Sequence, residues 1–144
     1  MRLLVTGCPK SGTQYMAELL CRLGLEATHE KVFALHRPED WGTKDVSVSW
    51  EAAANLEKAM MDGVTALWHQ VRDPLKVIRC MVSHKFLSDD GYGDASDFMK
   101  KHVPEAWAGK SLLDRTIRFW IGWNKLVEAG QALSRCISGT SWRI

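Results

Sequence analysis

The sequence predicts an α/β domain whose central sheet is parallel and flanked by helices. Three short apolar runs have the composition of strands and lie at residues 2–6, 46–50 and 64–71. Segments with a helical spacing of apolar residues follow these runs, and turn signals such as Gly24 mark where they end. Strands that alternate with helices are typical of α/β domains with a parallel sheet.

The length and composition predict one globular domain over residues 1–144. Single domains commonly run about 100–150 residues. The chain is 46% hydrophobic and 25% charged, which excludes intrinsic disorder, collagen-like repeats and a short disulfide scaffold. A formal net charge of +2 does not indicate a general nucleic-acid binder. No apolar run approaches the ~20 residues that span a bilayer. We therefore expect neither a nucleic-acid partner nor a membrane span, and the sequence leaves the oligomeric state open.

The cysteine pattern predicts reduced thiols in a cytoplasmic protein. No two cysteines form a CxxC pair, and no nearby His completes a zinc-ligand spacing, so no metal site is expected. Residues 5–8 resemble a lipoprotein cleavage site, but the apolar stretch before them is far shorter than the ~7–15 residues of a signal core. The four cysteines are Cys8, Cys21, Cys80 and Cys136.

The first predicted elements are a strand, a loop and a helix. The apolar run at residues 2–6 stops at Gly7, and a turn-rich loop follows over residues 7–13. Four apolar residues then fall on one helical face, and Gly24 is expected to end that helix. These four residues are Met16, Leu19, Leu20 and Leu23.

The middle of the chain predicts a second strand and helix, then a third strand. Residues 46–50 alternate as a short strand does, and residues 51–61 are Ala-rich and helical. Residues 64–71 predict a buried strand. Asp73 suits a helix N-cap and Pro74 suits the first helical position, so a helix is expected to begin there.

The last third of the chain predicts a loop and a long helix. Residues 89–97 are polar and contain two glycines, which predicts a loop. Residues 111–129 predict a strong helix, and Gly130 is expected to end it. The apolar stripe of this helix consists of Leu113, Ile117, Trp120 and Val127.

The loop at residues 7–13 has the parts of an anion-binding cradle. Its glycines allow the backbone to approach a ligand closely, and the helix after it offers unpaired N–H groups at the positive end of its dipole. Lys10 adds a full charge, while Ser11 and Thr13 add hydroxyl donors. Ligands of parallel sheets bind at the carboxyl ends of the strands, where this loop and residues 72–73 are both expected. A phosphate group is therefore the natural ligand.

The motif in this loop differs from that of the P-loop nucleotidases. Its glycine spacing agrees with GxxxxGK[ST], but Thr13 follows Gly12, and the lysine of the loop is Lys10. Residues 9–13 (Pro-Lys-Ser-Gly-Thr) instead resemble the phosphosulfate-binding loop of sulfotransferases, commonly written PKSGTT. Gln14 replaces the second Thr of that motif. These enzymes use 3′-phosphoadenosine 5′-phosphosulfate (PAPS).

A second segment resembles the one with which the same family binds the 3′-phosphate of PAPS. Residues 71–78 place an Arg at the end of a strand that leads into a helix. Arg72 suits this task because its fork of donors meets phosphate oxygens at two points. Cys80 stands where the family usually has Ser, and a thiol is a weaker donor than a hydroxyl. Ser83, about 4.5 Å further along the helix axis, is the alternative donor.

The resemblance covers roughly residues 2–130 and implies a three-layer, P-loop-like fold. It also implies transfer of a sulfuryl group from PAPS to a hydroxyl or amine, without a metal. Lys10 is the implied catalytic cation, because it neutralises the charge that grows on the leaving phosphate oxygen. The implied cofactor-binding residues are Pro9, Lys10, Ser11, Gly12, Thr13, Gln14, Arg72, Cys80 and Ser83.

The acceptor must also lose a proton to a base. Residues 28–30 (Thr-His-Glu) resemble a His-Glu pair that some bacterial sulfotransferases have at this place. Glu30 is therefore the first choice for the base, and His29 is the second. His69 and His84 are further imidazoles near the expected site.

The acceptor itself is expected to be a small molecule or a glycan, and its identity stays open. Among the seven tryptophans, Trp50 and Trp107 are the suggested acceptor contacts. Members of the family usually extend further and close a C-terminal segment over the cofactor. The resemblance thus implies a short or C-terminally truncated member, in which residues 141–144 begin a family strand.

Three functions stay open at this point. The first is a PAPS-dependent sulfotransferase, and the second is an inactive module of the same fold that keeps the nucleotide site. Cys80 and the short C-terminal part favour the second. The third is a P-loop kinase of small molecules, against which the position of Lys10 and the lack of a clear acidic strand end argue.

Overall fold

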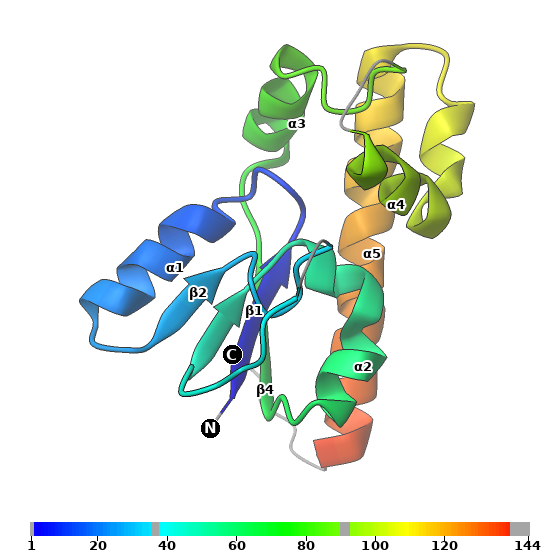
Figure 1. The fold of residues 1–144 in the computed structure, drawn as a ribbon. Coiled ribbons are helices and arrows are strands. Elements are labelled where there is room, and N and C mark those ends of the chain that lie inside the picture. The colour runs from blue at the N-terminus through cyan, green and yellow to red at the C-terminus, as the bar shows by residue number, and fades with distance from the viewer. Residues whose placement is uncertain (1, 36–37, 90–92, 139–144) are drawn as a thin grey trace.

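The structure of the chain is a computed structural model that describes residues 2–35, 38–89 and 93–138, with side chains as far as residue 132. Strands and helices alternate along the first half, and helices follow in the second (Figure 1). In chain order the elements are β1 (Leu3–Gly7), α1 (Thr13–Arg22), β2 (Ala27–His29), β3 (Val46–Val48), the 3₁₀ helix η1 (Glu51–Asn55), α2 (Leu56–Met61), β4 (Ala66–Gln70), α3 (Pro74–Ser83), α4 (Asp94–His102), the 3₁₀ helix η2 (Pro104–Ala108) and α5 (Leu112–Ser138).

The sheet has four strands in the order β2-β3-β1-β4, and every neighbouring pair is parallel. The register places Gly7 opposite Gln70 and His29 opposite Val48. The carboxyl ends of all four strands therefore meet at one edge. The predicted α/β class with a central parallel sheet flanked by helices is confirmed.

Helices cover both faces of this sheet (Figure 1). On one face, Ala17 and Leu20 of α1 pack with Val5 of β1. On the other face, Leu4 packs with Leu56 at the start of α2, and α5 contacts β1 and β4. The sheet is thus the middle of three layers, as an α/β domain requires.

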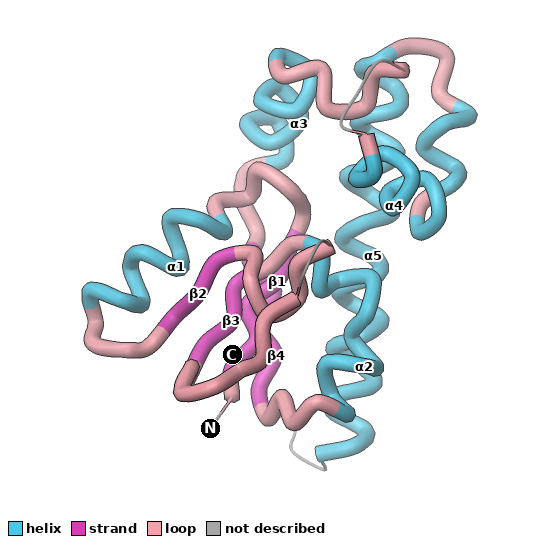
Figure 2. The backbone as a smooth tube through the Cα atoms, in the orientation of Figure 1, coloured by secondary structure: helices cyan, strands magenta, loops and turns pink. Residues whose placement is uncertain are grey.

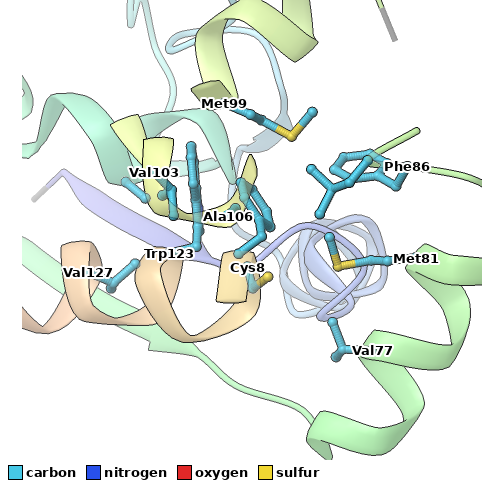
Figure 3. Close-up of a cluster of buried hydrophobic side chains, with 12 residues drawn as sticks. Cys8, Val77, Met81, Phe86, Met99, Val103, Ala106, Trp123 and Val127 are labelled. Carbon is cyan, nitrogen blue, oxygen red and sulfur yellow. The ribbon is translucent and has the colours of Figure 1, made fainter. Parts of the chain in front are cut away.

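A third apolar cluster lies between the carboxyl ends of the strands and the helices of the second half of the chain (Figure 3). Phe119 and Trp123 of α5 are fully buried in it and stack at 5.0 Å between ring centroids. Met81 of α3 and Cys8, in the loop after β1, belong to the same cluster. Because Cys8 is 1% exposed, the loop that follows β1 is anchored in the core. Burial also raises the pKa of the Cys8 thiol far above its ordinary value, so this cysteine is a neutral packing group.

The strand predicted over residues 64–71 exists, but it is not buried. β4 lies at an edge of the sheet, and its residues are only partly covered. The side chain of Trp68 is 52% exposed because α1 covers the other three strands on that face. The apolar run alone could not distinguish a central strand from an edge strand.

Two boundaries in the second half differ from the prediction. The loop predicted over residues 89–97 gives way to α4 at Asp94, because the fully buried Met99 anchors that helix in the core. Gly130 does not end α5, which continues to Ser138. A Cβ at Gly130 would lie 2.0 Å from Cδ1 of Leu56, so this glycine permits the close approach of α2 and α5.

Gly7 is required where β1 and β4 come together. A Cβ at this position would lie 2.1 Å from the carbonyl oxygen of Gln70, which is backbone and cannot rotate away. We expect Gly7→Ala to lower the free energy of unfolding by about 3 kcal/mol, measured by chemical denaturation. Gly24→Ala is the control: its Cβ would meet nothing within 4 Å, and only its φ of +87° is strained, so about 1 kcal/mol is expected. Equal losses in the two variants would contradict this account of Gly7.

Three further predictions concern membrane spans, the cysteines and the C-terminal strand. In the described residues, no helix is both long enough and apolar enough to cross a bilayer. Cys8, Cys21 and Cys80 are free thiols, and the side chain of Cys136 is outside the described part. The family strand predicted at residues 141–144 also lies outside the described residues.

Candidate functional site

The loop between β1 and α1 has an unusual backbone. Lys10 has a φ of 66° and Gly12 a φ of 100°, both in the left-handed region. The turn is closed by a hydrogen bond of 3.1 Å from the Ser11 amide to the Cys8 carbonyl. Left-handed residues in such turns are typical of backbone loops that bind anions. A left-handed conformation is costly for lysine, and it persists where the surrounding structure holds the backbone in place.

Ser11 places a buried hydroxyl in the same loop, beside Gly7. Its side chain is 3% exposed, and its hydroxyl has no hydrogen-bond partner among the described residues. The loop leads into the N-terminus of α1, where Gly12 supplies no side-chain cap and no acidic residue occupies the first turn. An anion placed here would receive hydrogen bonds from the first amides of the helix. The residues therefore fit the phosphate group that the sequence predicts.

The loop between β1 and α1 lies beside the segment that joins β4 to α3 (Figure 2). Two residues of that region, Gln70 and Arg72, hold the loop in place. The Arg72 guanidinium donates through Nη1 to the carbonyl of Lys10 at 3.2 Å. The Gln70 amide donates to the carbonyl of Ser11 at 3.4 Å. The two segments that sequence analysis singled out are thus in contact across 62 residues. Arg72 is exposed and uses one of its donors on the loop, which leaves the others for a ligand.

The Lys10 side chain is not neutralised by an acid. It forms no ion pair within the described ranges, and its Nζ lies 5.8 Å from the centroid of the Phe86 ring. Such a cation–π contact orients an ammonium group without cancelling its charge. Lys10 therefore keeps a full positive charge at the carboxyl edge of the sheet.

Glu30 follows β2 and is held by the residues that follow β3. The Ser49 hydroxyl donates to Oε2 of Glu30 at 2.6 Å, and the Trp50 amide donates to Oε1 at 2.9 Å. The Glu30 side chain is only 20% exposed, and its φ of 48° is left-handed. Lys10 and Glu30, the predicted cation and the predicted base, therefore both have strained backbones.

Burial raises the pKa of Glu30 from 4.5 to about 7. Desolvation of the carboxylate is the main cause, and the charge of Glu51 acts in the same direction. The hydrogen bonds from Ser49 and Trp50 oppose this effect because they stabilise the charged form. A carboxyl group with a pKa near 7 is suited to accept a proton at neutral pH.

His29 connects the anion loop to Glu30. Its Nε2 lies 3.1 Å from Oγ1 of Thr13 and 3.5 Å from Oε1 of Glu30. Burial lowers the pKa of His29, although the charge of Glu18 opposes this effect, so the ring is neutral at neutral pH. Both contacts use the same ring nitrogen. The arrangement is therefore not a nucleophile–His–acid triad, in which the acid binds the other nitrogen.

Three of the predicted cofactor-binding residues lie on helices, and their polar side-chain groups contact neighbours on the same helix or just beyond its end. The Gln14 side chain donates to Glu18 along α1, at 3.1 Å. On α3, the Ser83 hydroxyl donates to the carbonyl of Cys80 at 2.9 Å. Sγ of Cys80 lies 3.7 Å from Nδ1 of His84. Of the two positions proposed to contact the 3′-phosphate, neither offers a free hydroxyl.

The other residues considered from the sequence are buried or partly buried, and their side chains pack against the rest of the protein. Pro9 is buried within the loop between β1 and α1. The Trp50 ring packs against Phe86, Phe98 and Trp123, and Trp107 is partly buried against the same cluster. His69 is partly buried on β4, where its Nε2 lies 2.9 Å from Oδ1 of Asn124 on α5.

Two residues of the site were missed from the sequence, namely Ser49 and Gln70. Each stands where a strand gives way to a loop at the carboxyl edge of the sheet. Their positions beside Glu30 and Ser11 follow from the register between strands, which no local pattern records. The only available signal was that polar residues end two apolar runs.

The described side chains contain no cluster of three or more His, Cys, Asp or Glu residues that could hold a metal ion. Comparison with protein-family models gives no match for this chain, and no curated protein matches it either.

Proposed function

We propose that the chain is a PAPS-dependent sulfotransferase that acts on a hydroxyl or an amine. The observation that carries the proposal is the hydrogen bond from Arg72 to the backbone of Lys10. It joins the two segments that resemble the phosphosulfate and 3′-phosphate sites of sulfotransferases. The N-terminus of α1 supports the proposal further, because it has no side-chain cap and no acidic residue in its first turn, so its first amides suit an anion in the same loop.

The loop residues would bind the anionic end of the cofactor. PAPS supplies, when bound, a sulfuryl group on a phosphate leaving group. Ser11 and the first amides of α1 donate hydrogen bonds to the oxygens of this anion. The ammonium group of Lys10 stabilises the negative charge that grows on the leaving oxygen during transfer. Arg72 contributes its remaining donors to the second phosphate.

Glu30 would take the proton from the acceptor. With its pKa raised to about 7 by burial, about half of the Glu30 carboxyls are ionised at neutral pH. The proton moves from the acceptor hydroxyl or amine to a Glu30 oxygen as the acceptor oxygen or nitrogen attacks. His29, which is neutral and contacts both Glu30 and Thr13, is the second choice for this role. The proposed acceptor is a small molecule or a glycan.

Calorimetric titration with adenosine 3′,5′-bisphosphate, the spent cofactor, tests this proposal. We expect binding without magnesium, and a loss of about tenfold or more in Arg72→Ala, which is about 1.4 kcal/mol. The loss follows because Arg72 both contacts the ligand and holds the carbonyl of Lys10. Arg22→Ala removes the same charge from the last turn of α1, at the opposite end of that helix, and is expected to bind as the wild type does.

The opposite result has a clear meaning. A folded protein that fails to bind the bisphosphate at millimolar concentration contradicts the proposal. Binding of ATP with magnesium, in preference to the bisphosphate, would instead favour the kinase alternative.

A second function is favoured by the contacts on α3. The Cys80 thiol replaces a hydroxyl, and the Ser83 hydroxyl is used on the backbone of the same helix. A weakened 3′-phosphate contact lowers the affinity for PAPS, which favours an inactive module of the same fold that keeps the nucleotide site. Turnover with PAPS and a panel of acceptors separates this nucleotide-binding protein from the enzyme.

A further inference from the structure

We infer that Ser49 is a positioning residue, whose buried hydroxyl orients the carboxylate of Glu30 toward the acceptor. The hydroxyl donates to Oε2 of Glu30 at 2.6 Å, although 19 residues separate the two in sequence. Ser49 is 0% exposed, so water does not compete for this contact. The inference rests on the proposed role of Glu30 as the base.

The orientation of the Ser49 hydroxyl is fixed by its other contacts. Its backbone amide donates to the carbonyl of Val5 at 3.0 Å, which ties it to the central strand β1. Its Oγ accepts a hydrogen bond of 3.3 Å from the amide of Ala52, in η1. A serine hydroxyl has a single proton. Oγ accepts in its contact with Ala52, and it donates its proton in its contact with Oε2 of Glu30.

Three donated hydrogen bonds hold the carboxyl group of Glu30. The Ser49 hydroxyl donates to one oxygen, the amide of Trp50 donates to the other, and the amide of Glu51 also donates to this carboxylate. A carboxylate has about four acceptor positions, so one remains for an incoming proton. The Glu30 backbone is fixed as well, because its amide donates to the carbonyl of Val48 at 3.0 Å. Little rotation remains for the group that must meet the acceptor.

The charged groups around Glu30 work against its ionisation. Glu51 of η1 brings a like charge, and its carboxylate accepts a hydrogen bond from the amide of Leu35. His29 on β2 is neutral, and Glu18 of α1 acts on His29 rather than on Glu30. No full positive charge offsets the burial of Glu30 within 4 Å among the described residues. Donated hydrogen bonds, including that of Ser49, must therefore stabilise the ionised form.

Ser47 provides a matched control on the strand that leads to Ser49. It is also 0% exposed, and it lies in β3 two residues before Ser49, which follows the end of that strand. Its hydroxyl has no partner in the described part of the chain. Ser47→Ala and Ser49→Ala thus make the same chemical change at the same burial, and only the second removes a donor from Glu30.

The test is a titration of Glu30 itself, which requires neither cofactor nor acceptor. The carboxyl resonance is followed by NMR on protein labelled with ¹³C-glutamate, and Glu30→Gln identifies the signal. In Ser49→Ala we expect the proton affinity of Glu30 to rise about tenfold, which moves the midpoint about one pH unit upward. Ser47→Ala and Ser49→Thr, which leave a hydroxyl at position 49, are expected to keep the wild-type midpoint.

Either of two results overturns the inference. The first is a midpoint in Ser49→Ala that stays at the wild-type value, and the second is an equal displacement in Ser47→Ala. If Ser49→Ala does not fold, Ser49→Cys keeps the volume with a weaker donor, and an unchanged midpoint there is equally negative. The nucleotide titration described above is run on the same samples. A displaced midpoint without nucleotide binding refutes the proposed function only, whereas binding with an unmoved midpoint refutes the role of Ser49 only.

Discussion

Lys10→Gly is expected to abolish most of the proposed sulfuryl transfer while leaving the protein folded. The substitution removes the cation that we propose to stabilise the leaving oxygen, and loss of one such group typically costs 10²–10³-fold in rate. Affinity for adenosine 3′,5′-bisphosphate is expected to fall about tenfold or more. The rate of transfer from PAPS at saturating acceptor, together with calorimetry, measures both effects.

Glycine is the informative substitution because of the backbone at this position. Lys10 has a φ of 66°, which costs a non-glycine residue about 1–2 kcal/mol. Glycine relieves that strain, but it adds about 0.5–1 kcal/mol of conformational entropy to the unfolded chain. The two terms nearly offset each other. The free energy of unfolding is therefore expected to change by no more than about 1 kcal/mol. A loss of transfer activity in Lys10→Gly would then not result from unfolding of the variant.

The chain contains its own control for this experiment. Lys85, just beyond α3, is exposed and has a left-handed φ of 50°. Lys85→Gly makes the same change in charge and backbone, and its transfer rate and affinity should equal those of the wild type. Transfer by Lys10→Gly at the wild-type rate would show that the charge at position 10 has no part in the reaction. Equal losses in both variants would assign the effect to net charge instead.

The parts of the fold that the sequence predicted are those with local causes. The apolar run of β1, the glycines of the loop and the Asp73–Pro74 start of α3 all act within a few residues. Asp73 caps α3 as expected, since its side chain accepts from the amides of Leu75 and Lys76. Local stereochemistry fixes such features before any tertiary contact forms.

The errors arose where a distant neighbour decides the outcome. Gly130 would end an isolated helix, yet Leu56 packs so closely on it that glycine is the residue that lets α5 continue. α4 begins within a polar stretch, and its anchor Met99 is buried in a cluster with distant residues that include Ala106 of η2 and Phe119 of α5. In both cases tertiary packing overrode the local signal.

The candidate site shows the same division. Lys10 and Arg72 were selected by motifs, and the structure places them in contact. Glu30 was selected by order along the chain, and its burial was not foreseen. Ser49 reaches Glu30 only because the parallel pairing of β2 and β3 sets His29 opposite Val48. Register between strands depends on the whole sheet, so neither the contact nor its effect on the pKa of Glu30 could be read from the sequence.

Glu30→Gln is expected to lower the rate of transfer by about 10²–10⁴-fold, the range for loss of a general base. The amide keeps the shape of the side chain but cannot accept the proton from the acceptor. The groups on the β1–α1 loop that we propose to bind the nucleotide are untouched, so affinity for adenosine 3′,5′-bisphosphate should stay near the wild-type value. Glu57→Gln, at an exposed position on α2, is the control and should leave the rate unchanged.

The same substitution has a second effect, on stability, whose sign follows from the raised pKa of Glu30. Folding lifts this pKa from 4.5 to about 7, so the folded state favours the protonated form. Below pH 4.5 the carboxyl is protonated in both states and costs nothing. As the pH rises toward 7, the unfolded state loses its proton first, and the wild type loses roughly 3 kcal/mol at about 1.4 kcal/mol per unit. Above that pH the loss is constant.

Denaturation of wild type and Glu30→Gln over this pH range tests the argument without any assay of activity. The free energy of unfolding of the wild type should fall, relative to the variant, between pH 4.5 and about 7, with no further relative change above it. Parallel stability curves would mean that Glu30 titrates as an ordinary surface carboxyl, which would remove the reason to regard it as a base at neutral pH. A relative fall in stability combined with undiminished transfer would keep the buried carboxyl but assign the proton to another group, and His29 would be next to test because it contacts both Glu30 and Thr13.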